Sequence, residues 1–210
     1  MKCLNYSETT DLFIQYIDQE VKAPYWQIRY GTAKERAKRC EKKDYFSDLK
    51  KAFNSFVQAH SDDGQVISWL DSLTLMRRVA IKLREYDLQY IDYITEYVIP
   101  FANSKRPDYI LSFKNTVLLI EFGRNTDYNA KLSQAIQYQV LLENLFQRSI
   151  KVIPYVFIYN IEFDEKMEEK VSFIEKNNTI VLELALLIKR LYETDTTAIE
   201  ELFKLDYERL

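Results

Sequence analysis

The feature that most restricts the fold is a pair of short apolar runs, 109–113 and 116–122, separated by only two residues. Runs of this length, rich in β-branched and aromatic residues, predict strands, and the two-residue connection predicts a hairpin. A helical stretch without glycine or proline follows from residue 128 to about residue 148, and a further strand-like run covers 151–159. The sequence therefore predicts an α/β fold with a small mixed central sheet flanked by helices.

Further elements surround this segment. One more strand-like run, 90–99, stops at Pro100. Apolar residues at helical spacing predict additional helices before and after the sheet. The predicted helices cover 8–22, 44–60 and 66–83 on the N-terminal side, and 162–176, 180–192 and 196–204 on the C-terminal side.

No repeat, linker or low-complexity segment divides the chain, so we expect one domain over 1–210. Within it, 1–65 is a helical N-terminal extension and 66–160 is the core. Residues 161–210 are an acidic helical C-terminal part, with 13 Asp and Glu against seven Lys and Arg.

Composition excludes several classes of site. Three glycines in 210 residues exclude a glycine-rich phosphate loop, and one histidine with two distant cysteines excludes zinc-finger and zinc-protease motifs. A metal in this chain would have to be a hard cation held by carboxylates. Two unpaired cysteines and the absence of a signal peptide predict a reducing cytoplasm, and no apolar run is long enough to span a membrane.

Two carboxylates mark a candidate site. Asp108 follows Pro107 at the start of one hairpin strand, and Glu121 follows four apolar residues near the end of the other. A hairpin brings the start of one strand close to the end of its partner, so we expect these two side chains to meet. Two adjacent carboxylates repel unless a proton or a cation lies between them, which predicts a Mg²⁺ or Mn²⁺ site. The alternative is that Asp108 caps a turn and Glu121 faces solvent.

The helix after the hairpin carries a polar patch on its inner face. At 100° per residue, Lys131, Gln134 and Tyr138 fall within an arc of about 60°. The same face continues as Ala135, Leu142 and Leu145. We therefore expect the apolar half of this face to cover the sheet and the polar half to line a site, although polar residues at a core margin would show the same pattern.

Pro107-Asp108, Glu121 after a hairpin, and Gln134-x-x-x-Tyr138 together resemble the PD-(D/E)XK nuclease superfamily, in particular its RecB-like branch. The stretch from Glu96 to Asp108 also looks like nuclease domains that precede helicase-like ATPases. The resemblance covers about residues 66–160. It implies a restriction-endonuclease-like αβββαβ core and hydrolysis of phosphodiester bonds.

The resemblance also implies roles for individual residues. Asp108 and Glu121 would hold the divalent metal that activates water. The family's lysine, two residues after the glutamate, is replaced here by Gly123. Lys131 or Arg124 could supply the missing positive charge, and we favour Lys131, since strand alternation points Arg124 away from the face that carries Glu121.

Other candidates are less specific. Glu85 or Glu96 could provide a third acidic group, and we favour Glu96 as a metal ligand. Basic residues that could contact phosphates are Arg77, Arg78, Lys82, Arg106 and Arg124. The expected catalytic residues are Asp108, Glu121, Lys131, Gln134 and Tyr138.

The sequence thus predicts a Mg²⁺- or Mn²⁺-dependent nuclease acting on DNA in defence, repair or mobile-element biology, with RNA not excluded and a homodimer or a helicase-like partner possible. The alternative is a degenerate nuclease fold that binds nucleic acid or protein without cleaving. A third interpretation, an interaction protein built on the acidic C-terminal helices, rests on charge alone.

Overall fold

The computed structural model of the chain describes residues 6–20, 63–99, 105–113, 116–124, 128–146, 150–159 and 177–194, with isolated positions at 38, 47–48, 50–51, 53–54 and 102. The elements are, in chain order, β1 (Tyr6–Ser7), α1 (Thr10–Glu20), α4 (Asp63–Glu85), β2 (Asp92–Thr95), β3 (Tyr109–Phe113), β4 (Thr116–Arg124), α5 (Tyr128–Leu145), β5 (Lys151–Tyr159) and α7 (Asn178–Thr194). From α4 to β5 the order is helix, three strands, helix, strand. The predicted fold class is confirmed.

The described strands form one mixed sheet in the order β1-β2-β3-β4-β5. Neighbours from β1 to β4 are antiparallel, and β5 lies parallel to β4. Phe113 pairs with Thr116, so the predicted hairpin between β3 and β4 is confirmed. A parallel pair needs a crossover connection, and α5 supplies it between β4 and β5.

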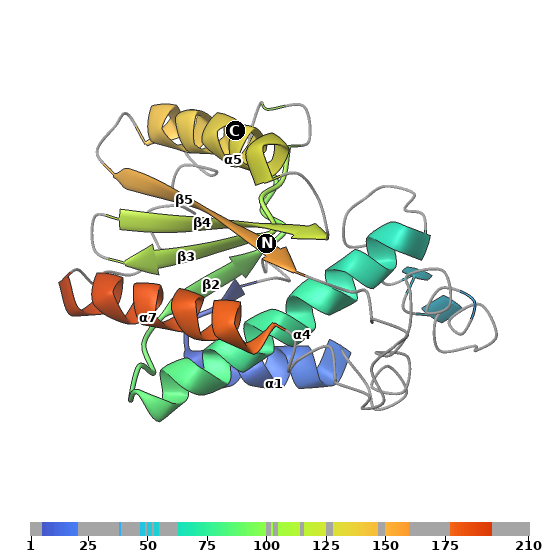
Figure 1. Cartoon of the computed structure of the whole chain (residues 1–210), viewed down its shortest axis with the longest axis horizontal. Helices are drawn as coiled ribbons and strands as arrows, with labels where there is room; N and C mark the ends of the chain where they lie inside the picture. Colours follow the sequence, from blue (N-terminus) through green and yellow to red (C-terminus); the bar gives the residue numbers. More distant parts are fainter. Residues whose placement is uncertain are drawn as a thin grey trace.

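Helices cover the sheet on both faces. Helix α5 lies on one side, and α1, α4 and α7 lie on the other (Figure 1). Strand β4 shows how alternation separates the two layers. Leu118, Ile120 and Phe122 belong to the core cluster that includes α4, whereas Val117 and Leu119 belong to the cluster that includes α5. The run of apolar residues in β4 is therefore needed because both faces are buried.

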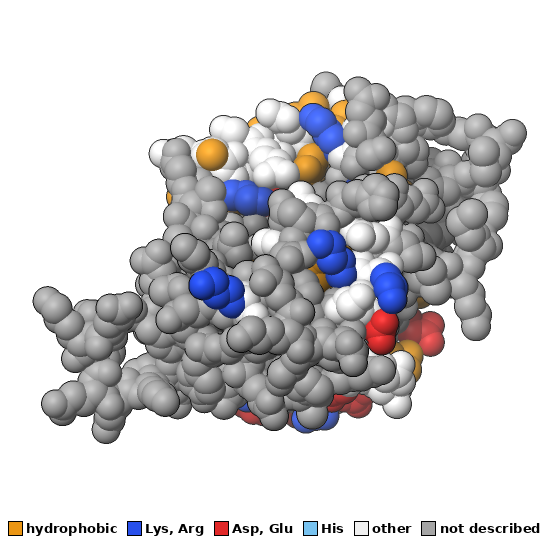
Figure 2. All heavy atoms as spheres, turned by 90° about the vertical axis from the view of Figure 1, so that its right-hand side faces the viewer, with side chains coloured by type: hydrophobic (Ala, Val, Ile, Leu, Met, Phe, Trp, Pro, Cys, Tyr) orange, Lys and Arg blue, Asp and Glu red, His pale blue; other side chains and the backbone are white. Residues whose placement is uncertain are grey.

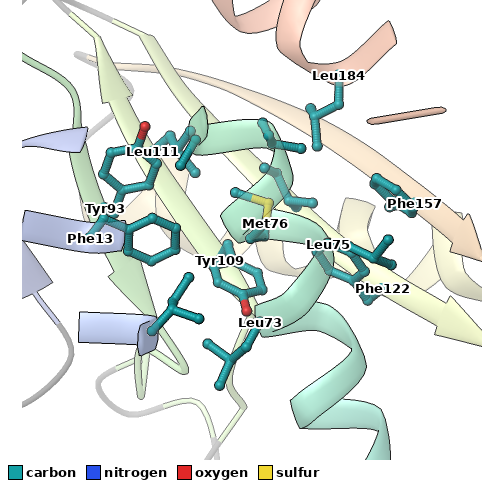
Figure 3. Close-up of a cluster of buried hydrophobic side chains, with 14 of the residues drawn as sticks. Phe13, Leu73, Leu75, Met76, Tyr93, Tyr109, Leu111, Phe122, Phe157 and Leu184 are labelled. Atoms are coloured by element: carbon teal, nitrogen blue, oxygen red, sulfur yellow. The ribbon is translucent and has the colours of Figure 1, made fainter. Parts of the chain in front are cut away.

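Aromatic stacking joins α1 to the sheet and β4 to β5 in the larger cluster (Figure 3). The rings of Phe13 on α1 and Tyr93 on β2 stack with their centroids 4.2 Å apart. Phe122 on β4 stacks on Phe157 of β5 at 4.7 Å. Burying each such side chain contributes about 1.5–3 kcal/mol, so this cluster fixes β4, which carries Glu121.

The structure differs from the sequence prediction in two places. The strand predicted over 90–99 is only β2, because Glu96 has a φ of 51° and its left-handed backbone ends the extended conformation. Strand β1 was not predicted, since two residues are too short for a periodicity to show. The predicted helices 162–176 and 196–204 and most of the predicted helix 44–60 lie outside the described residues. Among the described helices, none combines the length and the apolar character needed to cross a membrane.

Candidate active site

Three carboxyl-bearing residues occupy neighbouring positions in a row across one end of the sheet. Thr95 pairs with Tyr109, and Tyr109 pairs with Ile120. One step further along each strand lie Glu96, Asp108 and Glu121. The Glu96 N–H donates to the Asp108 carbonyl at 3.0 Å, which continues the β2–β3 pairing past the end of β2. Register therefore brings these residues together from three separate parts of the chain.

The carboxylates of Asp108 and Glu121 are each held by the backbone of the other residue's strand. The Asp108 N–H donates to Glu121 Oε1 at 3.2 Å, and the Phe122 N–H donates to Asp108 Oδ2 at 2.7 Å. One oxygen of each carboxylate is thus fixed by a backbone donor. Glu121 is 1% exposed and Asp108 is half-buried, so the interpretation of Glu121 as a solvent-facing residue is wrong.

Helix α5 brings the predicted polar patch to this pair. Lys131 Nζ lies 3.4 Å from Glu121 Oε2, and Gln134 Nε2 donates to the Tyr138 hydroxyl at 2.8 Å. The helix buries Ala135, Tyr138, Leu142 and Leu145, as the predicted face requires. Glu121 follows Leu119 by two residues, so both project to the face that α5 covers.

Burial raises the pKa values of the three carboxyl groups in this site. Desolvation, followed by repulsion from Asp108, raises the pKa of Glu121 to about 9, and Lys131 lowers it only in part. Desolvation and the same repulsion raise the pKa of Glu96 to about 8, against the opposing effects of Arg106 and Lys131. Burial also raises the pKa of Asp108. A cluster that holds protons in this way is a favourable place for an added cation, and such perturbed groups gather at functional sites.

The segment that leads into Asp108 makes two further polar contacts. Arg106 Nε lies 3.4 Å from Glu96 Oε2, with the two side chains 24% and 12% exposed. Lys105 Nζ donates to Gln137 Oε1 on α5 at 3.1 Å. Arg106 is one of the predicted phosphate contacts. Lys105 is not, and only its position three residues before Asp108 could have suggested it.

The basic residues of α4 are not brought to the carboxylates. Helix α4 covers the sheet face opposite α5, and its Ser72 lies 3.2 Å from the Tyr109 hydroxyl. Lys82 is ten residues further along the helix, about 15 Å toward the other end of the sheet. Lys82 pairs with Glu85 at 2.6 Å and Arg77 pairs with Asp18. Arg78 lies on the same helix, one residue after Arg77.

Two further predicted positions lie on β4 beyond Glu121. Gly123 is buried and pairs with Ile158 of β5. The backbone of Arg124 pairs with Tyr159, while its side chain lies outside the described part of the structure. Of the two candidates for the missing positive charge, Lys131 is therefore the one whose ammonium group the structure locates.

The backbone donors of the site could not be predicted from the sequence. The Phe122 N–H that anchors Asp108 belongs to an apolar residue and leaves no sequence signal. Within the described residues, no group of three or more His, Cys, Asp or Glu side chains is arranged to hold a metal ion. A cation would therefore rest on Asp108 and Glu121, with other oxygens completing its shell.

Figure 2 shows the side of the molecule toward which β4 runs. Described lysine and arginine side chains are spread over this face, and described acidic side chains appear toward its lower edge.

In comparisons with known proteins, no protein-family model and no curated protein sequence matches the chain. The functional assignment therefore depends on the geometry of the site.

Proposed function

We propose that this chain is a metal-dependent nuclease that hydrolyses phosphodiester bonds in DNA. The observation that carries the proposal is the pair of carboxylates, Asp108 and Glu121, locked to each other's strands and faced by Lys131 from α5. A structural ion pair would need one acid and one base. Here two neighbouring acids, half-buried Asp108 and buried Glu121, are faced by the ammonium group of Lys131. The raised pKa values of both acids indicate that this lysine does not fully compensate their ionised forms, so a divalent cation could take the place of a bound proton.

The donor set fits Mg²⁺ or Mn²⁺. These hard cations take oxygen ligands, and Mg²⁺ is commonly held by one or two carboxylates together with waters and substrate phosphates. Asp108 and Glu121 would hold the ion, each with one oxygen already oriented by a backbone N–H. When bound, a divalent cation would lower the pKa of a coordinated water and withdraw charge from the phosphoryl group.

The remaining side chains have roles that follow from their contacts. The Lys131 ammonium lies against Glu121, where it can neutralise charge that develops on the phosphate. Burial raises the pKa of Tyr138, so its hydroxyl stays protonated and acts as a hydrogen-bond donor. Since that hydroxyl accepts from Gln134 Nε2, its own proton is directed elsewhere, and we assign it to the carboxylates or the substrate. Arg106, which pairs with Glu96 next to Asp108, is a further candidate for contact with a substrate phosphate.

DNA is favoured as the substrate by the motif resemblance, with RNA as an alternative ligand of the same chemistry. A role in defence, repair or mobile-element biology, and a helicase-like partner, are proposals of the same origin.

One observation favours a second candidate, a nucleic-acid- or protein-binding module without cleavage. Gly123 offers no side chain on the face where the family places its lysine. Catalysis then depends on Lys131 taking over that function from α5.

The two candidates are separated by incubating the chain with plasmid and single-stranded DNA in Mg²⁺, in Mn²⁺ and in EDTA. The nuclease should cut with either metal and not in EDTA, and Asp108→Ala or Glu121→Ala should lose at least about a hundredfold in rate, since each removes a metal ligand. Glu193→Gln on α7, which removes an exposed carboxylate, is the matched control. Cleavage by either alanine variant at the control's rate would remove this site from consideration.

A further inference from the structure

Glu96 adopts an unfavourable backbone conformation beside the candidate site. Its φ of 51° lies in the left-handed region, which costs a residue with a side chain roughly 1 kcal/mol. The backbone is nevertheless held there, since the Glu96 N–H donates to the Asp108 carbonyl at 3.0 Å. Such outliers persist where the surrounding structure determines them, and they gather at functional sites.

The side chain of Glu96 is paired with a base and does not complete a ligand set. Its Oε2 lies 3.4 Å from Arg106 Nε, and both side chains are largely withdrawn from solvent. Within the described residues, no cluster of three potential metal-ligating side chains includes it. Glu96 was expected to be a metal ligand, whereas its carboxylate lies against the guanidinium of Arg106.

Arg106 is constrained from the other side by the chain itself. Pro107 follows it, and the residue before a proline is restricted to extended conformations. Arg106 is also only two residues from Asp108, whose carboxylate the Phe122 N–H fixes. An arginine whose backbone is restricted and whose guanidinium contacts a carboxylate loses little freedom when it meets a phosphate.

We propose that Glu96 is a positioning residue that holds Arg106 for a substrate phosphate next to the Asp108–Glu121 pair, and that it is not a ligand of the divalent cation. This inference rests on the proposed function, because it takes the substrate to be a phosphodiester. It assigns the recognition of the phosphate backbone to the segment before β3, on the same face as the two carboxylates, and not to the basic residues of α4.

The test combines a double-mutant cycle with two binding measurements. Glu96→Ala, Arg106→Gln and the double variant are compared with wild type and with Glu193→Gln, which removes a carboxylate on α7. Affinity for Mn²⁺ alone is measured by calorimetry. Affinity for a fluorescein-labelled single-stranded DNA oligonucleotide is measured by anisotropy in Ca²⁺, and KM and kcat are measured in Mg²⁺.

A positioning role predicts that Glu96→Ala leaves Mn²⁺ affinity within about twofold and weakens oligonucleotide binding about tenfold, mainly through KM. The double variant should bind no more weakly than Arg106→Gln, because Glu96 acts through Arg106. Glu96→Gln, which keeps the shape and an oxygen that can accept from Arg106, should bind the oligonucleotide more tightly than Glu96→Ala does, and it carries the test if the alanine variant does not fold.

Three results would overturn the inference: a loss of Mn²⁺ affinity of tenfold or more in Glu96→Ala, multiplicative losses in the double variant, or no oligonucleotide binding by wild type. Failure of the nuclease proposal is distinguishable. If wild type cleaves nothing but the binding cycle behaves as described, the positioning role stands and the nuclease proposal falls. If wild type cleaves while Glu96→Ala binds the oligonucleotide as wild type does, the nuclease proposal stands and the positioning role falls.

Discussion

The protonation of Glu121 gives a quantitative prediction for the metal-free protein. Its carboxyl group has an ordinary pKa of 4.5, and burial and repulsion from Asp108 raise the pKa to about 9 in the folded state. The folded chain thus keeps a proton that the unfolded chain has lost between these two values. For an acid with a raised pKa, the stabilisation is complete below the unfolded value and decreases as the pH rises. One proton corresponds to about 1.4 kcal/mol of unfolding free energy for each pH unit.

Glu121→Gln removes this dependence while keeping the shape of the neutral acid. Lys131 would then face an amide at the position where Glu121 Oε2 lies. The weaker contact lowers the unfolding free energy by the same amount at each pH in this interval, so it does not change the slope against pH. Between about pH 6.5 and pH 7.5, wild type in EDTA should therefore lose on the order of 1 kcal/mol of unfolding free energy relative to the variant. In saturating Mn²⁺, wild type should instead be more stable than the variant. A cation that binds only the folded state stabilises it, and the variant lacks one of the two proposed metal-binding carboxylates.

Urea unfolding followed by tryptophan fluorescence measures the difference, since Trp69 is buried in the core. Glu193→Gln controls for the loss of one negative charge elsewhere. Parallel curves for wild type and Glu121→Gln across this pH interval would refute the argument. They would mean that Glu121 is already ionised in the metal-free protein, and that nearby positive groups and hydrogen-bond donors stabilise its negative charge more than the contacts indicate.

Two further predictions concern metal binding and the sheet edge. Because Asp108 and Glu121 must lose protons to bind a cation, Mn²⁺ affinity should rise about tenfold for each proton released per pH unit, and a calorimetric affinity that stays constant from about pH 6.5 to 7.5 would contradict this. Glu143→Ala should cost about 1–3 kcal/mol in urea unfolding because it strands the Val152 N–H, which donates to Glu143 Oε1 at 3.3 Å. It should leave cleavage per folded molecule unchanged, since Val152 pairs with β4 at the end away from Glu121.

The sheet and the facing polar residues were predictable because each has a local sequence signal. Two apolar runs two residues apart specify a hairpin, and pairing then places the residue before one strand opposite the end of the other. The position of Asp108 relative to Glu121 follows from that rule alone. Helical periodicity likewise predicted the inner face of α5, since spacing fixes which of its side chains point inward.

Which helix covers which face could not be predicted, because no local pattern encodes it. Arg77 and Lys82 are close to the site in sequence order, yet α4 packs on the face opposite α5 and its basic residues pair with Asp18 and Glu85. The contact between Glu96 and Arg106 depends on a left-handed residue at the end of β2. Glutamate in that conformation is unfavourable, so propensity argues for continued strand and tertiary contacts decide otherwise.

The proposal that Lys131 replaces a strand lysine can be tested by placing a lysine on β4. Position 123 faces the same side as Glu121 by alternation, and its glycine presents no side chain to α5. Lys131→Met removes the ammonium group and keeps an unbranched stem, so it should slow cleavage without abolishing Mn²⁺ binding. Adding Gly123→Lys to that variant should recover at least about tenfold in rate, equivalent to about 1.4 kcal/mol of transition-state stabilisation.

Gly123→Met combined with Lys131→Met is the matched control, since it adds the same bulk to β4 without the charge. Melting temperatures establish that all variants fold before their rates are compared. A folded Gly123→Lys, Lys131→Met variant that cleaves no faster than this control would show that the ammonium group of Lys131 does not substitute for a strand lysine. If wild type and Gly123→Lys both bind DNA and cleave nothing, the replacement of that lysine by glycine is not compensated from α5, and the binding module is the better account of the fold.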